Sequence, residues 1–114
     1  MPEQAPVSYQ VFFPLGSTML GDQDRNTLAA AAQVYKTKAN ARVSVTGFTD
    51  TVGSPELNMR LGQARADAVK NVLVQNGVPA GSITTAASGE GDPLVPTGAQ
   101  TNEMRNRRVV VVIQ

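Results

Sequence analysis

The chain has 114 residues, of which 41% are apolar and 17% are charged, and these values are ordinary for one globular domain. Ten Lys and Arg residues against nine Asp and Glu residues give a net charge of +1, so we expect no nucleic-acid partner. The sequence has no cysteine and no histidine, which removes disulfides, the commonest metal ligands and the commonest general base. We therefore expect no metal site, no cofactor and no enzymatic activity.

The first residues, 1–6, contain Pro2 and Pro6 and are mostly polar, so we interpret them as a tail or the end of a linker. Residues 7–114 are then one domain. The start also lacks the basic and apolar stretches of a secretory signal, which leaves either a cytoplasmic chain or a piece of a longer protein. The longest apolar run, Val109 to Ile113, is far below the ~20 residues of a membrane-spanning helix, so no membrane insertion by this domain is expected.

The first half of the domain predicts one strand and one helix. Aromatic and β-branched residues alternate with others over 9–13, which predicts a strand that stops at Pro14. A helix is expected to run to about Lys38, with either Asp22 or Asp24 as its N-cap.

A second strand and a longer helix follow. Alternation over 43–46 predicts the strand, which leads into a polar loop. Ser54 followed by Pro55 and an acidic residue is a strong helix start, and Gly77 is a typical stop, so the helix is placed at about 55–76.

Two further strands, over 82–87 and 107–113, complete the domain. The last is β-branched almost throughout and is expected to be buried on both faces. The order is strand, helix, strand, helix, strand, strand. This order predicts an α+β fold with a mixed four-stranded sheet and two main helices on one face.

The long helix carries two polar residues on one face, Asn58 and Arg65, which are seven residues and so about two turns apart. We expect the buried stripe on other positions, so that these two lie near its edge and reach a cleft. The expected apolar stripe is Leu57, Leu61, Ala64, Ala68 and Val72.

The polar loop before the helix contains one carboxylate, Asp50. If the loop folds back along the helix, Asp50 and Arg65 would offer an acceptor and a five-donor fork to one ligand that carries an ammonium and a carboxylate. Spacing alone leaves the alternative that the two pair with each other or face solvent. The basic cluster from Arg105 to Arg108 also has two interpretations: it contacts a phosphate or carboxylate group, or it is a solvated strand end.

An ordered set of motifs extends along most of the chain. The set begins with the run from Val45 to Ser54 and ends with Asn106-Arg107-Arg108-Val109. Between them stand Asn58, Leu61, Ala64-Arg65-Ala66, Gly77-Val78, Ile83 and Gly89-Glu90. Together these motifs resemble the signature of the OmpA-like C-terminal domain family, and the resemblance covers the chain from about Val11 to Ile113.

The resemblance implies a non-catalytic periplasmic module that binds peptidoglycan through the diaminopimelate of the stem peptide. It implies that Asp50 takes the ammonium group, that Arg65 takes the carboxylate and that Asn58 lines the pocket. Further ligand-binding residues by motif position are Thr49, Thr51 and Val52 in the framing loop, and Asn106 and Arg107 as weaker matches. Such a module is expected to anchor an envelope protein, attached to the outer membrane through an N-terminal part not included here.

The chain departs from the family pattern at two places. Phe48 stands where histidine is common, and Pro14-Leu15-Gly16 stands where a polar, Asp-containing stretch is common. The chief alternative is an adaptor whose main partner is another envelope protein, and a hydrolase is a further one. For the binding module, we expect Asp50→Ala or Arg65→Ala to abolish binding while the domain stays folded.

Overall fold

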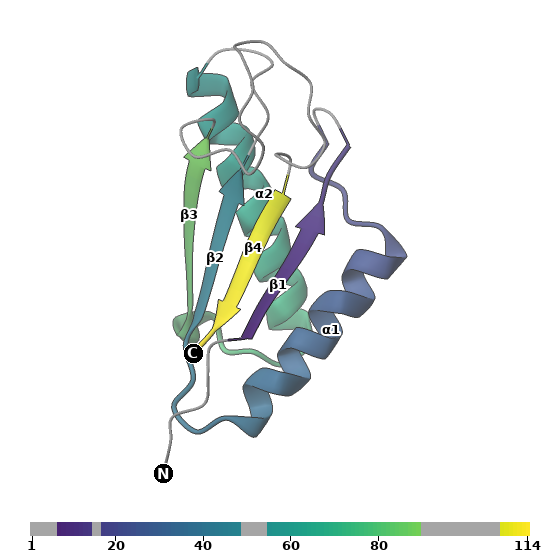
Figure 1. Cartoon of the computed structure of the whole chain (residues 1–114), viewed down its shortest axis with the longest axis vertical. Helices are drawn as coiled ribbons and strands as arrows, with labels where there is room; N and C mark the ends of the chain where they lie inside the picture. Colours follow the sequence, from purple (N-terminus) through teal and green to yellow (C-terminus); the bar gives the residue numbers. More distant parts are fainter. Residues whose placement is uncertain (1–6, 15–16, 49–54, 90–107) are drawn as a thin grey trace.

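The computed structural model describes residues 7–14, 17–48, 55–89 and 108–114 (Figure 1). Its elements follow the predicted order of strands and helices. They are β1 (Val7–Phe12), α1 (Asp22–Thr37), β2 (Val43–Phe48), α2 (Pro55–Gln75), the 3₁₀ turn η1 (Ala80–Ser82), β3 (Ile83–Gly89) and β4 (Arg108–Ile113).

The four strands form one mixed sheet in the order β1-β4-β2-β3. β4 lies antiparallel to both of its neighbours, and β2 lies parallel to β3. Both helices pack against the same core on one face of the sheet; in Figure 1, α2 passes behind the strands and α1 lies to the right of β1. The predicted α+β class, the mixed sheet and the position of the helices are therefore confirmed.

The helix-covered face of the sheet holds the core. Alternate residues of the strands point into it, and Val11, Val45 and Val109 are fully buried. On the other face of the central strand β4, Val110 and Val112 are only half-buried. The expectation that the last strand is buried on both faces is wrong, because the two helices cover one face only.

The N-terminus of α1 corrects the expected cap. The N-cap residue is Gly21, and no side chain caps the helix there. Asp22 and Asp24 lie inside the first turn instead. Their carboxylates still lie near the positive end of the helix dipole, which is why acidic residues at this position are compatible with the helix.

The buried face of α2 differs from the expected stripe. Leu57 is 57% exposed, Ala64 is exposed, and of the five expected residues only Val72 is buried. The buried face of α2 consists of Asn58, Gly62, Arg65, Ala66, Val69, Val72 and Leu73. These positions also recur every three or four residues, so the period was right and the face was wrong.

A glycine pair sets this face of α2. A Cβ atom added to Gly47 of β2 would overlap the backbone carbonyl oxygen of Gly62. The helix backbone therefore packs directly on the strand, which only residues without a side chain allow. With Gly62 turned toward the sheet, positions 58 and 65, one turn before and after it, must turn inward as well.

The C-terminus of α2 closes as predicted at Gly77. This residue has φ +100, the left-handed conformation that glycine adopts at low cost. The N–H of Gly77 donates to the carbonyl of Val74 (3.0 Å), and that of Val78 donates to Leu73 (3.0 Å). This pair of bonds is the Schellman motif, and the side chain of Val78, its last residue, is buried.

Candidate functional site

One edge of the molecule gathers the segments that carry the predicted site. β1, β2 and β3 end at this edge, and β4 and α2 begin there, at the upper end of Figure 1. The predicted residues that adjoin these ends in the sequence, but lie outside the described residues, are Thr49, Asp50, Thr51, Val52, Asn106 and Arg107. Of the predicted site, the structure describes Asn58 and Arg65.

Arg65 is fully buried, at 0% exposure, and donates to three backbone carbonyls. Its Nε donates to Ser17 (2.9 Å), its Nη2 to Pro14 (3.1 Å) and its Nη1 to Phe48 (3.4 Å). Its guanidinium carbon also lies 5.2 Å from the centre of the Phe13 ring. A single side chain on α2 therefore fastens the chain after β1 to the end of β2.

The burial of Arg65 corrects the expectation that it stands at the edge of the helix face. Arginine is rarely fully buried unless its donors find partners. Here the rigid fork of the guanidinium matches carbonyls that come from segments 48 to 51 residues away from it, and from the end of β2. These three bonds hold the guanidinium of Arg65 in a fixed position at this edge.

A second arginine lies at the same edge. Arg108, the first residue of β4, is 6% exposed, and its guanidinium carbon lies 3.8 Å from the centre of the Phe48 ring. This distance is short for a cation over an aromatic face and indicates close stacking. The residue that departs from the family pattern, Phe48, thus contacts both arginines, one through its carbonyl and one through its ring.

Sequence reasoning grouped Arg108 with a basic cluster but did not foresee this contact. The sequence did offer a signal for it. Arg108 begins a β-branched strand and Phe48 ends another strand, and side chains at such positions can stack when the two strands are neighbours in the sheet. Asn58, the other described member of the predicted site, is 3% exposed. Asn58 and Arg65 therefore share one face of α2, as their spacing predicted, but that face is buried, and the expectation that Asn58 lies near its edge is wrong as well.

Two buried arginine side chains and the ring of Phe48 lie at this edge. Arginine is a common partner of carboxylates in proteins. Among the described residues there is no group of His, Cys, Asp and Glu side chains that could hold a metal ion. No helix in the described part of the chain has the length and apolarity needed to cross a membrane.

The profile of the OmpA family matches residues 12–107. The chain is 37% identical over 103 residues to the probable lipoprotein YiaD of Escherichia coli, covering 90% of this chain and 47% of that protein. It is 32% identical over 107 residues to a peptidoglycan-associated lipoprotein of Brucella melitensis, covering 94% of this chain and 64% of that protein. The chain thus spans about half to two-thirds of these relatives.

The fold of the chain is also similar to solved structures. The fold matches the crystal structure of the peptidoglycan-associated lipoprotein from Burkholderia pseudomallei with a TM-score of 0.84 and 30% identity, over 92% of this chain and 89% of that one. It also matches the OmpA-like domain of FopA1 from Francisella tularensis with a TM-score of 0.85, at 22% identity and over 94% of this chain and 71% of that one. Together with the family match over most of its length, these similarities establish that the chain belongs to the OmpA family.

Proposed function

We propose that this domain binds peptidoglycan non-covalently and without catalysis, through the diaminopimelate of the stem peptide. It would thereby hold an envelope protein to the cell wall in the periplasm. The proposal is supported by family membership and by the similarity to peptidoglycan-associated lipoproteins. The observation that carries it is the placement of Arg65 at the end of β2, where its Nη1 donates to the carbonyl of Phe48, two residues before Asp50.

The proposed ligand matches the charges of this edge. The side-chain end of diaminopimelate carries an ammonium and a carboxylate on one carbon, so it needs an acceptor and a donor fork close together. In the proposal Asp50 accepts from the ammonium, the positive charge of Arg65 attracts the carboxylate, and Asn58 lines the pocket. Thr49, Thr51 and Val52 frame the ligand, with Asn106 and Arg107 beside Arg108 as further contacts.

The burial of Arg65 changes how the proposal can be tested. Removing this side chain would also remove three hydrogen bonds that hold the fold, so a loss of binding in Arg65→Ala would not identify a ligand contact. Asp50 is the sharper target. Asp50→Asn keeps the size of the side chain and removes the charge that the ammonium requires.

The test is calorimetric titration of the domain with a stem tripeptide that contains diaminopimelate, beside its lysine-containing analogue. The analogue lacks the distal carboxylate, so we expect it to bind at least about tenfold more weakly. Asp50→Asn should weaken the diaminopimelate peptide by at least about tenfold. Asp67→Asn is the matched control, because it removes an exposed carboxylate on α2 and should leave binding unchanged.

Two results would count against the proposal. Equal affinity for the two peptides would mean that the distal carboxylate is not recognised. Unchanged binding in Asp50→Asn, with a thermal unfolding midpoint equal to that of the wild type, would remove Asp50 from the site. A third result would favour a protein partner bound to the wall. The domain would then stay on purified sacculi even when diaminopimelate peptides are added as competitors.

A further inference from the structure

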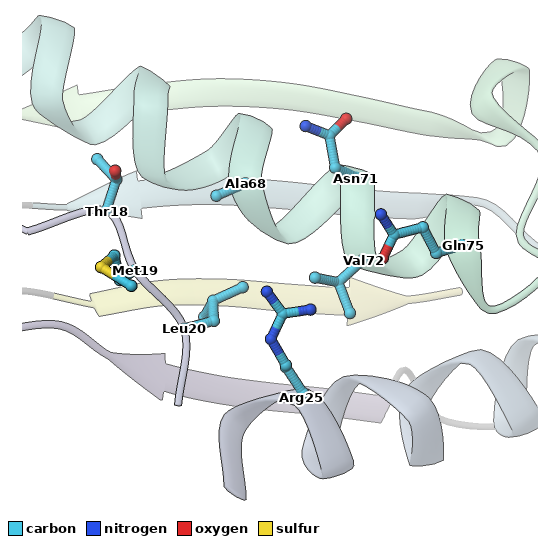
Figure 2. Close-up of a pocket in the computed structure, with 8 residues that line it drawn as sticks. All are labelled: Thr18, Met19, Leu20, Arg25, Ala68, Asn71, Val72 and Gln75. Atoms are coloured by element: carbon cyan, nitrogen blue, oxygen red, sulfur yellow. The ribbon is translucent and has the colours of Figure 1, made fainter. Parts of the chain in front are cut away.

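A groove between α1 and α2 includes none of the predicted peptidoglycan-binding residues (Figure 2). Its cavity has a volume of about 320 Å³, at the lower end of the range for small-ligand pockets. One wall comes from α2 and the other from α1 and the segment before it. The lining residues are Thr18, Met19, Leu20, Arg25, Ala68, Asn71, Val72 and Gln75.

The groove combines one positive charge with an apolar floor. Figure 2 shows the Arg25 guanidinium reaching from α1 to a position between Leu20 and Val72. Val72 is buried and Leu20 half-buried, so they form the floor, while Met19 is 79% exposed beside them. Met19 is the most exposed large apolar side chain in the described part of the chain, and methionine adapts readily to the shape of a ligand.

The charge of Arg25 is available to a ligand. Its side chain is exposed, and among the described residues the structure gives its guanidinium no hydrogen bond and no ion pair. Asp22 and Asp24 lie in the same turn of α1. Their carboxylates disfavour a densely acidic ligand, so a ligand with a single carboxylate fits this groove best.

We propose that this groove binds the free C-terminus of a peptide or protein whose last residue is apolar. The terminal carboxylate pairs with the guanidinium of Arg25, and the last side chain lies on Leu20 and Val72 beside Met19. The amide of Gln75, on the α2 wall, can donate to or accept from the adjoining peptide group. This site is independent of the proposed peptidoglycan site and stands whether or not that proposal holds.

The Arg25 guanidinium lies between Leu20 and Val72 (Figure 2), so a ligand must present its carboxylate and its apolar group side by side. This arrangement favours the C-terminus of a chain over an acidic side chain. In a C-terminal residue the carboxylate and the apolar side chain branch from the same carbon, so both reach a cation that lies over an apolar floor. In an extended internal segment, successive side chains point to opposite sides. An acidic residue next to an apolar one would therefore turn its carboxylate away from Arg25 when the apolar side chain enters the groove.

The test uses three short probes and NMR titration of the ¹⁵N-labelled domain. They are acetyl-Ala-Leu with a free carboxylate, the same dipeptide as its C-terminal amide, and acetyl-Asp-Leu amide, whose only charge is on a side chain. We expect the free acid to bind roughly fivefold more tightly than either amide. The largest shifts should fall on the backbone amides of Met19, Leu20 and Gln75.

Two variants decide the role of Arg25. Arg25→Gln should lower the affinity for the free acid to that of the amide, and it should fold normally because the side chain is exposed. Arg42→Gln removes another exposed cation, in the residue before β2, and should keep the full preference for the free acid. The proposal is overturned if no probe binds, if acid and amide bind equally, if the preference survives in Arg25→Gln, or if acetyl-Asp-Leu amide equals the free acid.

Discussion

The two ends of the sheet are closed by different kinds of interaction. At the end that carries the proposed peptidoglycan site, a buried arginine fastens three carbonyls, and a second arginine stacks on Phe48. At the opposite end, the contacts among the described residues are mainly backbone hydrogen bonds. The backbones of Arg42 and Gln114 exchange reciprocal N–H···O bonds (2.9 and 3.0 Å), and the Schellman motif ends α2. A neutral pair completes that end, where the hydroxyl of Tyr35 donates to Ser82 Oγ (2.8 Å).

This contrast shows at which end of the sheet the fold buries charged groups. A fully buried cation carries a desolvation penalty that backbone motifs and neutral hydroxyls do not. Among the described residues, the two buried charged side chains, Arg65 and Arg108, both lie at the end where the family resemblance locates the ligand. Costly groups concentrate at functional sites, so the comparison supports the proposed site independently of the motif.

The largest expected effect is on Arg65. Arg65→Ala leaves three carbonyls without their donor and opens a cavity between α2 and the sheet, so we expect it to lower the free energy of unfolding by about 3 to 5 kcal/mol. Urea denaturation followed by circular dichroism measures this loss. Arg60→Ala, on an exposed position of the same helix, should change stability by no more than about 0.5 kcal/mol. If the two variants were equally stable, the stability of the domain would not depend on the buried arginine at the end that carries the proposed peptidoglycan site.

A smaller loss is expected from the glycine contact that turns Arg65 inward. In Gly47→Ala the new methyl group would overlap the carbonyl of Gly62, so α2 must move off the sheet at a cost of about 1 to 3 kcal/mol. Gly81→Ala is the matched control, because a Cβ atom at that position meets nothing within 4 Å. Thermal unfolding of both variants checks this. A Gly47→Ala midpoint equal to that of Gly81→Ala would refute the direct backbone packing.

The smallest effect is expected at the opposite end. Tyr35→Phe removes one partly buried hydroxyl bond and keeps the ring, so we expect a loss of about 0.5 to 1.5 kcal/mol. A double-mutant cycle with Ser82→Ala isolates the contribution of the pair. Because either single variant already removes the bond, the double variant should lose less stability than the sum of the two single losses. A loss as large as that of Arg65→Ala would erase the contrast between the two ends.

Local patterns in the chain were enough to predict the elements and their order. Alternation predicted the strands, Gly77 predicted the end of α2, and the order of elements predicted the α+β class, because these signals act between neighbours in the chain. The seven-residue spacing also placed Asn58 and Arg65 on one face of α2. The motif run from Val45 to Ser54 identified the family that the comparisons established.

Which face of α2 is buried, and which groups Arg65 contacts there, depends on contacts between segments that are distant in the chain. The helical period is the same for either face, and the apolar Leu57 and Ala64 favoured the wrong one. The contact of Gly47 with Gly62 and the carbonyls of Pro14 and Ser17 chose the other face. These partners lie 15 to 51 residues from the α2 residues they meet, and a local pattern carries no information about contacts at that separation.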